Sequence, residues 1–343
     1  MDEKLEAYYG LPNEVKFCKK CVISNQRPNS TVEMKNKNKK KETIAFNDKN
    51  ICSACSFNDE KREIDWKERE EKLFELLEPY RSKDGSYDVL VPSSGGKDSA
   101  FAAHILKYKY KMNPLAITWA PNMFTRAGWN NFNGLSRVGG VDSFLYTPNG
   151  KLHSYLTKLA FTNLGHPFQP FVHGQKVIGP KLAQKFGIKL IMYGENQAEY
   201  GNPLEDNKDP FMKPDFFTMD NPLDMLLGGE KVEDLIKDTE FTLNDFAPYI
   251  PPTPEEISTT ETKVTFLGYF EKWEPQECYY YAVDNTGFMP SYERSIGTYS
   301  RYTEIDDKIV PFHFYMTYIK FGIGRATYDA AQEVRNGKIT REE

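Results

Sequence analysis

The sequence lacks any apolar run that could cross a membrane, and it lacks an excess of positive charge. A membrane-spanning helix needs about 20 predominantly apolar residues, and no stretch of the chain approaches that length. The first residues, Met1-Asp2-Glu3-Lys4, also lack the basic and then apolar layout of a signal peptide. We therefore expect a cytoplasmic protein without membrane insertion. The formal net charge of −5 disfavours a nucleic-acid partner, whose phosphates require a basic surface.

Cysteine is also scarce, which excludes a disulfide framework. Five cysteines in 343 residues are too few for a fold held together by disulfide bonds. Four of them form two CxxC pairs, Cys18 with Cys21 and Cys52 with Cys55. Two such pairs can present four thiolates to one tetrahedral ion, so we predict a closed, structural Zn²⁺ site in a ribbon-like module. The fifth, Cys278, stands among aromatic residues and is expected to be a packed thiol.

Short apolar runs alternate with amphipathic segments along much of the chain. Strands are expected at 88–92, 114–119, 141–146 and 188–193, and helices at 62–80, 101–110, 152–164 and in a segment ending at Phe186. This alternation is typical of a mostly parallel sheet covered on both faces. From about residue 200 prolines and acidic residues become frequent and the periodicity fades. We therefore predict an α/β, doubly wound fold with a zinc ribbon at 1–60, a sheet domain at 61–200 and a less regular, partly helical region at 201–343.

The most informative motif lies between an expected strand and an expected helix, and it reads Ser94-Gly95-Gly96-Lys97-Asp98-Ser99. Its glycines let the backbone turn tightly and bring N–H groups close to a ligand. The start of the helix directs free N–H groups and the positive end of its dipole to the same place. Together with the lysine and the serine hydroxyls, these groups form an anion site suited to phosphate or pyrophosphate. The motif is not a Walker A loop, because Val91 occupies the first glycine position and an aspartate follows the lysine.

Two further groups of candidates follow from the expected sheet. In an open parallel sheet, ligands bind at the carboxyl ends of the strands. Thr118 and Trp119 end the second strand and are therefore candidates for the adenine side of a nucleotide. Gly194, Glu195 and Asn196 follow the last expected strand and are candidates for the reacting centre. There Glu195 would hold Mg²⁺ or orient a nucleophile.

The hexapeptide resembles the PP-loop of the ATP pyrophosphatase superfamily, whose fold is that of the adenine nucleotide alpha hydrolases. Members include GMP synthetase, asparagine synthetase and the tRNA thiolases. The resemblance implies that ATP is cleaved to AMP and pyrophosphate through an adenylylated intermediate, and that 61–200 is the PP-loop domain. It implies a role for each loop residue: Asp98 would approach Mg²⁺, and pyrophosphate would be held by Ser94, Gly95, Gly96, Lys97 and Ser99.

Stretches along the rest of the chain, with the Cys₄ module, resemble the N-acetyl sugar amidotransferases, including the pseudaminic-acid amidotransferases. These stretches are Gly165–Gln175, Met192–Asn196, Glu293–Thr298, Ile305–Lys308 and Lys320–Arg325. The resemblance implies that the acetamido group of a bacterial surface sugar, a nonulosonic acid or diacetamido sugar, becomes an acetamidino group. Such sugars belong to lipopolysaccharide or flagellin glycans. ATP would activate the amide oxygen and ammonia would displace AMP, with Lys97, Asp98 and Glu195 as catalytic residues.

An acidic sugar or sugar nucleotide requires cations and hydrogen-bond donors on the protein. The expected substrate-binding residues, which lie mostly in region 201–343, are Arg294, Lys320 and Arg325, with Gln175, Asn196, Thr298 and Asp306 as polar partners. His166 and His173 are expected to pack or to bind substrate, not metal. The sequence contains no recognisable glutaminase, so the resemblance to related systems implies a separate glutaminase subunit that supplies ammonia.

Two other functions compete with this interpretation. A PP-loop tRNA thiolase would need a reactive cysteine or an iron–sulfur cluster and a basic surface, whereas the paired cysteines are assigned to zinc and the chain is acidic. A non-catalytic nucleotide-binding scaffold would not need the carboxylate of Asp98. Finally, Thr340–Glu343 has the form of a capping box at the start of a helix, so either a helix is cut short at residue 343 or the pattern is accidental.

Overall fold

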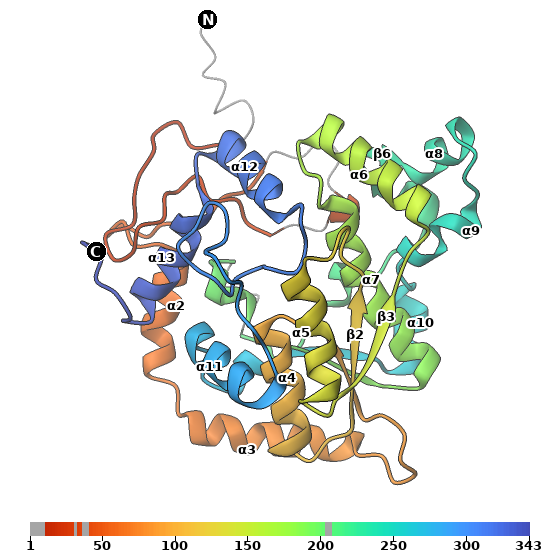
Figure 1. Ribbon diagram of the computed structural model, residues 1–343, viewed down its shortest axis with the longest axis horizontal. Helices are drawn as coiled ribbons and strands as arrows, with labels where there is room; N and C mark the ends of the chain where they lie inside the picture. The colour runs from red at the N-terminus through yellow and green to blue at the C-terminus, as the bar shows by residue number, and fades with distance from the viewer. Residues whose placement is uncertain (1–10, 31–32, 36–40, 203–207) are drawn as a thin grey trace, which may run out of the picture.

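A parallel, five-stranded sheet forms the centre of the computed structural model, which describes residues 11–30, 33–35, 41–202 and 208–343 (Figure 1). Its strands are β1 (Val89–Pro92), β2 (Pro114–Trp119), β3 (Asp142–Tyr146), β4 (Leu190–Tyr193) and β7 (Lys263–Phe266). They are arranged in the order β3-β2-β1-β4-β7. The strand order reverses between β1 and β4, so the loops after these two strands meet at a topological switch point, where ligands bind in open α/β sheets.

The strands direct alternate side chains into two separate cores. In β1, Val89 and Val91 lie in the core under one face and Leu90 lies in the core under the other. In β2, Ile117 lies on the same side as Leu90, and Ala116 lies on the opposite side. Because both faces are buried, such strands appear in the sequence as nearly continuous apolar runs.

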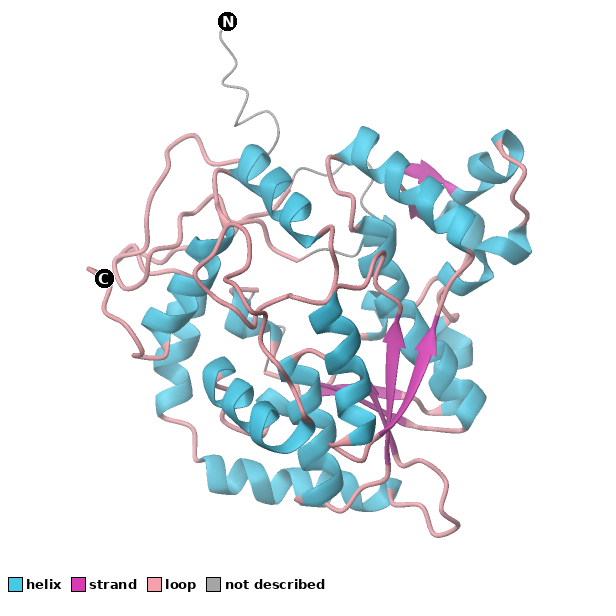
Figure 2. Ribbon diagram, in the orientation of Figure 1, coloured by secondary structure: helices cyan, strands magenta, loops and turns pink. Residues whose placement is uncertain are grey.

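Helices cover both faces of the sheet, which confirms the predicted doubly wound α/β fold (Figure 2). The side of Leu90 is covered by α6 (Gly150–Leu164) and α7 (Gln169–Phe186), and the side of Val89 by α3 (Trp66–Leu77), α4 (Lys97–Tyr108), α5 (Arg126–Arg137) and α11 (Pro275–Thr286). α7 can approach β2 closely because it carries Gly174, where an added Cβ would lie 2.5 Å from the ring of Trp119.

The fifth strand comes from a part of the chain for which the sequence predicts no strand. β7 pairs with β4 in parallel, with Lys263 opposite Leu190 at one end and Phe266 opposite Tyr193 at the other. From the same part of the chain, α11 packs against α4. The expected boundary near residue 200 therefore does not mark the end of the sheet. The other elements of region 201–343 are β5 (Leu226–Leu227), β6 (Glu230–Lys231), α8 (Val232–Asp238), α9 (Leu243–Phe246), α10 (Pro254–Thr260), α12 (Val310–Phe321) and α13 (Arg325–Arg335).

The cysteine-containing module and the C-terminal helix lie side by side, at the left of Figure 1. The module ends in α2 (Ser53–Arg62). The Asn58 side chain of this helix donates a hydrogen bond to the carbonyl oxygen of Arg335 at 2.9 Å, and Arg341 donates to the carbonyl oxygen of Cys21 at 3.2 Å. Two segments from opposite parts of the sequence thus form one small core.

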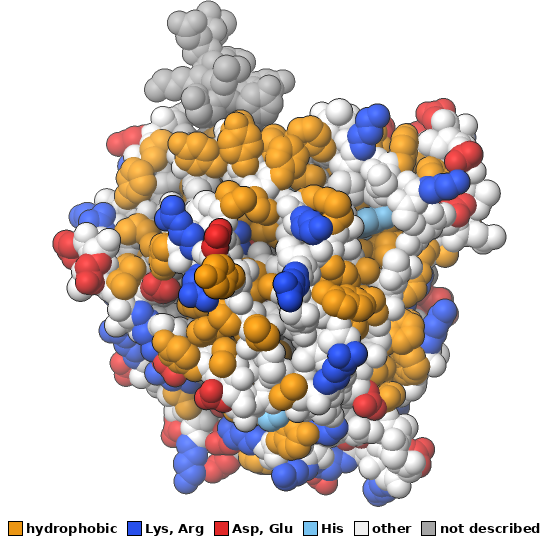
Figure 3. All heavy atoms as spheres, viewed as in Figure 1, with side chains coloured by type: hydrophobic (Ala, Val, Ile, Leu, Met, Phe, Trp, Pro, Cys, Tyr) orange, Lys and Arg blue, Asp and Glu red, His pale blue; other side chains and the backbone are white. Residues whose placement is uncertain are grey.

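Helix α12 presents apolar side chains to solvent. Tyr315, Tyr318 and Ile319 are each more than half exposed, and hydrophobic side chains gather around this helix at the upper edge of Figure 3. None of the helices in the described ranges combines the length and apolar composition that crossing a bilayer requires.

Candidate functional site

The loop between β1 and α4 can be formed only with glycine at position 95. Gly95 has φ +81, and a Cβ there would lie 2.6 Å from the backbone nitrogen of Phe132 on α5. Gly96 is the N-cap of α4, and no side chain caps this end of the helix. The first N–H groups of α4 therefore remain available to an anion at the switch point.

Lys97 and Asp98 place a cation and an anion side by side at this helix start. The ammonium of Lys97 lies 2.5 Å from Oδ2 of Asp98, and its side chain is only 7% exposed. Burial favours the neutral amine, but the neighbouring Asp98 carboxylate outweighs burial and raises the pKa of Lys97. The other carboxylate oxygen of Asp98, Oδ1, is buried and has no hydrogen-bond partner among the described residues. An unpartnered buried carboxylate oxygen is unfavourable, so Oδ1 is a candidate contact for a cation, a ligand donor or water.

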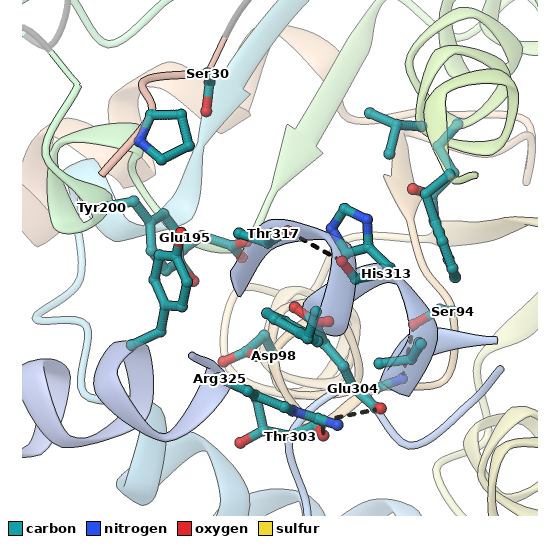
Figure 4. A pocket seen from close by; sticks show the side chains of 18 of the residues that line it. Ser30, Ser94, Asp98, Glu195, Tyr200, Thr303, Glu304, His313, Thr317 and Arg325 are labelled. Carbon is teal, nitrogen blue, oxygen red and sulfur yellow. Dashed lines mark hydrogen bonds between the residues drawn. The ribbon is translucent and has the colours of Figure 1, made fainter. Parts of the chain in front are cut away.

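Glu195 enters the same space from the end of β4 (Figure 4). The backbone before it packs tightly, since a Cβ at Gly194 would lie 2.8 Å from the ring of Trp273. Burial, followed by the neighbouring Asp98 carboxylate, raises the pKa of Glu195 to about 7, while Lys97 and Tyr200 act in the opposite direction. Glu195 therefore changes its charge near neutral pH.

A third acidic segment, residues 304–307, faces the loop from the C-terminal region. Glu304 has the positive φ of 44, and its partial removal from bulk water raises the pKa of its side chain to about 7, against the effect of Arg325. Asp306 contacts α5 at Gly128, where a Cβ would lie 2.5 Å from the Cα of Asp306. Asp307 accepts hydrogen bonds from the backbone N–H groups of Asn122 at 2.6 Å and Met123 at 3.2 Å. These contacts hold the segment against the loop after β2.

The loop 94–99, Glu195, Glu304 and Asp306 line one cavity of about 1640 Å³. In Figure 4, Asp98 lies between Glu195 on one side and Glu304 on the other. The cavity also extends along α7, α12, α13 and the cysteine-containing module. Its size exceeds that of ordinary small-molecule sites, so there is room for a nucleotide and a second substrate.

The carboxylates fit a Mg²⁺ ion. Mg²⁺ prefers oxygen ligands, commonly one or two carboxylates together with the phosphates of a nucleotide. Asp98 offers the unpartnered Oδ1, and Glu195 is close enough for each charge to be felt by the other. These two residues would hold the ion.

The four cysteines of the two CxxC pairs meet in one cluster. All four are buried, and their sulfur atoms lie within 4.8 Å of one another. The backbone N–H groups of Lys20 and Cys52 each approach the sulfur of Cys18 at 3.4 Å, as is favourable for a negatively charged thiolate. The cluster therefore fits a tetrahedral Zn²⁺ ion with no open position.

Most of the predicted site residues line the cavity: Ser94, Gly95, Gly96, Lys97, Asp98, Ser99, Gln175, Gly194, Glu195, Asp306, Lys320 and Arg325. Trp119 lines it as well. His166 also lies at the wall, and burial lowers its pKa to about 3. His173 instead bonds to the carbonyl oxygen of Tyr249 at 2.6 Å. Cys278 is buried in the core, as expected of a packed thiol.

Four predicted residues are not brought to the cavity wall. Thr118 is buried in β2, on the strand side opposite to Trp119. Asn196 is buried and caps the short helix after β4, accepting from the N–H of Ala198 at 3.0 Å. Thr298 is buried and donates a hydrogen bond to Asp329. Arg294 is exposed outside the cavity. Three of these side chains are buried elsewhere and the fourth is exposed to solvent, and position in the sequence alone does not reveal this.

Glu304, Tyr200 and Arg27 are among the cavity residues that the sequence-based predictions do not include. Glu304 directly precedes the stretch Ile305–Lys308, and this adjacency is the only signal that could have identified it. Tyr200 reaches the cavity from the short helix after β4. Arg27 reaches it from the cysteine-containing module, which the sequence suggested to be purely structural.

Comparisons with known proteins give one family match, one curated relative and one solved structure to report. Residues 296–343 match the family described as LPS biosynthesis protein WbpG-like, C-terminal domain. An uncharacterized protein of Methanocaldococcus jannaschii is 32% identical over 87 residues, which is 23% of this chain and 28% of that protein's length. The structure of NMN synthetase from Francisella tularensis matches with a TM-score of 0.28 and 15% identity, over 58% of this chain and 93% of that one.

The matched segment supplies part of the cavity wall, including Glu304, Asp306 and Arg325. It also contains α13, which packs against the cysteine-containing module. The region that faces the loop 94–99 is thus similar to the C-terminal domain of WbpG-like LPS biosynthesis proteins.

Proposed function

We propose that this chain is an ATP-dependent amidotransferase that converts the acetamido group of a bacterial surface sugar to an acetamidino group. The amide oxygen of the sugar attacks the α phosphorus of ATP, and pyrophosphate leaves. Ammonia then adds to the activated carbon, and AMP departs with the former amide oxygen. The products are the amidine, AMP and pyrophosphate.

One observation carries this proposal. The glycine-rich loop at the switch point, with Lys97 and the unpartnered Oδ1 of Asp98, opens into the same cavity as residues 304–306 and Arg325. Those residues belong to the segment that resembles a lipopolysaccharide biosynthesis domain. The proposal is supported because a loop suited to phosphate and a segment similar to an LPS biosynthesis domain line the same cavity.

The residues of the cavity suit the charge changes of the reaction. Lys97 and the free N–H groups of α4 would bind the pyrophosphate that leaves. Mg²⁺, held by Asp98 and Glu195, would neutralise the phosphate charge. Glu195 has a pKa of about 7, so its carboxylate could alternatively take a proton from ammonia after addition. Both roles of Glu195 require an ionised carboxylate.

The source of ammonia is part of the proposal. We expect a separate glutaminase subunit, because no cysteine in the chain is suited to glutamine hydrolysis. All five cysteines lie in the described ranges: four form the compact cluster, Cys278 is buried, and none lines the cavity. The same observation disfavours a tRNA thiolase, which needs a reactive cysteine or an iron–sulfur cluster near its nucleotide.

The test is a product analysis with defined acceptors. The zinc-loaded protein is incubated with ATP, Mg²⁺ and ammonium chloride, together with diacetamido sugars, nonulosonic acids or their nucleotide-linked forms. Mass spectrometry follows the sugar, and AMP is measured in parallel. We expect one acceptor to exchange an oxygen atom for an NH group with equal amounts of AMP. We expect Asp98→Asn to reduce the rate by at least about a hundredfold, whereas Asp284→Asn, at an exposed position on α11, should not.

Each alternative outcome has a defined meaning. AMP formed without a change in any sugar would support ATP cleavage but contradict the acceptor class. ATP that binds and stays intact with every acceptor would contradict the enzyme and favour a nucleotide-binding scaffold.

A further inference from the structure

One end of the cavity wall has no role in the proposed reaction. It is formed by the cysteine-containing module and by α13, and it carries two guanidinium groups, those of Arg27 and Arg335. Arg27 follows the first CxxC pair, and Arg335 ends α13. The two arginines are neighbours because the module and α13 share a core.

Arg27 forms no ion pair with a carboxylate of the residues that the structure describes. Its Nη1 atom is buried and has no hydrogen-bond partner in the described part of the chain. Its guanidinium carbon lies 5.5 Å from the ring centroid of Tyr328. Burial lowers the pKa of Arg27, and the strongest charge effects on it come from Tyr328, Arg335, Cys52 and Tyr200. None of these is a carboxylate, so the positive charge is left for a ligand to neutralise.

Arg335 adds a second cation beside the loop that carries Glu195. Its Nη2 donates to the carbonyl oxygen of Glu199 at 3.1 Å, and no carboxylate pairs with it among the described residues. Two further polar atoms nearby in the wall, Nε2 of Gln332 and Oδ1 of Asn29, are also buried without partners.

Arg325, at the start of the same helix, provides a contrast. The carboxylates of Glu304, Asp329 and Asp306 act on its charge, and its guanidinium donates to the carbonyl oxygens of Thr303 and Glu304. Its charge is therefore already balanced by the protein. The balance differs at the other end of α13, where no carboxylate of the described residues pairs with Arg335, and the nearby Glu333 instead accepts a hydrogen bond from the Tyr299 hydroxyl at 2.8 Å.

We propose that Arg27 and Arg335 bind an anionic group of the acceptor, either the carboxylate of a sugar acid or the diphosphate of a sugar nucleotide. A guanidinium binds either group through paired, charge-assisted hydrogen bonds. Anchored at this end, the acceptor would extend past Glu199 toward Glu195. The proposal rests on the proposed function for the identity of the acceptor, and it gives the cysteine-containing module a direct part in substrate binding.

The test compares charged and neutral probes by isothermal titration calorimetry, with Mg²⁺ and a non-hydrolysable ATP analogue present. The probes are a diacetamido nonulosonic acid, a UDP-linked diacetamido sugar and the methyl glycoside of a neutral diacetamido sugar. We expect one charged probe to bind, and Arg27→Met to weaken that binding at least about tenfold. The charged probe that responds identifies carboxylate or diphosphate as the recognised group. Affinity for the neutral probe should stay the same, and Arg27→Lys should be intermediate.

Controls separate binding from folding. Arg137→Met removes an exposed arginine outside the cavity and should change no affinity. Arg27→Met should keep its zinc content and its affinity for the ATP analogue. If it fails to fold, Arg335→Met provides the same comparison from α13.

Two results would overturn the inference: equal affinity of wild type and the arginine variants for the charged probes, or no binding of either charged probe to wild type. Its failure can be told apart from failure of the proposed function. If the protein forms amidine and AMP, and Arg27→Met leaves the KM for the acceptor unchanged, the proposed function stands and the anion site is rejected. If Arg27→Met loses binding of the charged probe, and the wild-type protein forms no AMP with any acceptor, the anion site stands and the proposed function is rejected.

Discussion

At the scale of single residues, Glu195 links the ionisation of the site to metal binding. Its pKa is raised from 4.5 to about 7, first by burial and then by Asp98. A raised carboxyl pKa means that the native state holds this proton more tightly than the unfolded chain does. Ionisation of Glu195 therefore lowers the stability of the metal-free protein as pH rises from about 4.5 to about 7.

We predict that Mg²⁺ stabilises the protein more at pH 8 than at pH 6, because protons compete with the ion for Glu195 at the lower pH. Thermal unfolding with and without Mg²⁺ at the two pH values measures the difference. Glu195→Gln should reduce the Mg²⁺ effect and make it nearly independent of pH, with affinity about tenfold or more weaker at pH 8. An unchanged pH dependence in this variant would show that another group controls metal binding.

At the scale of elements, the cysteine-containing module is joined through α2 to the segment that follows Glu195. Lys61 of α2 forms a buried ion pair with Glu199 at 2.5 Å, and Ser53 donates to the carbonyl oxygen of Gly201 at 2.9 Å. Arg335 of α13 contacts the carbonyl oxygen of Glu199 as well. The segment after Glu195 is thus held from two sides by elements that depend on the cysteine cluster.

We predict that removal of the metal from the cysteine cluster weakens acceptor binding more than nucleotide binding. The lost metal would loosen α2, α13 and the position of Arg27, while the loop 94–99 is built on β1 and α4. Cys52→Ser, or treatment with a chelator, should destabilise the protein by at least about 2 kcal/mol and weaken the charged-probe affinity at least about tenfold.

Three measurements test this prediction. Mass spectrometry gives the metal content, calorimetry follows unfolding, and titration gives the affinity for an ATP analogue. Cys278→Ser serves as the control, because this thiol lies in the sheet core and outside the cluster. A metal-free protein with unchanged stability and unchanged acceptor affinity would contradict the structural role of the cluster.

The elements that sequence could predict are those with a local signal. The sequence predicts β2 at its observed bounds, because PLAITW is a mostly apolar run of six residues, and all six are buried in the structure. The loop 94–99 was recognisable because its glycines and charges are adjacent in sequence. β7 is only four residues long, and it is a strand because β4 provides its partner. The positions of Glu304 and Arg27 at the cavity likewise depend on contacts between distant segments, and no local pattern encodes such contacts.

At the scale of the whole molecule, both cores draw on each half of the chain. Val264 of β7 and Tyr249 complete the core on the side of α7, and Phe270, Trp273 and Ala282 complete the core on the side of α4. Without the second half, β4 would become an open edge, and the apolar residues that face α11 would be exposed. The cavity also depends on both halves of the chain, since residues 304–306 and α13 line it together with the loop 94–99.

We therefore predict that a fragment of residues 1–200 does not fold on its own, although it contains the cysteine cluster and the complete loop 94–99. The fragment should show no cooperative thermal transition by circular dichroism, should bind a hydrophobic dye, and should not bind an ATP analogue. The full chain should unfold cooperatively, should not bind the dye, and should bind the ATP analogue. A cooperative transition in the fragment, together with nucleotide binding, would instead show that 61–200 is an independent domain. Region 201–343 would then contribute only the acceptor side of the cavity. The expected result places the unit of folding at the level of the whole sheet, because β7 and α11 complete the structure that presents the loop to its ligand.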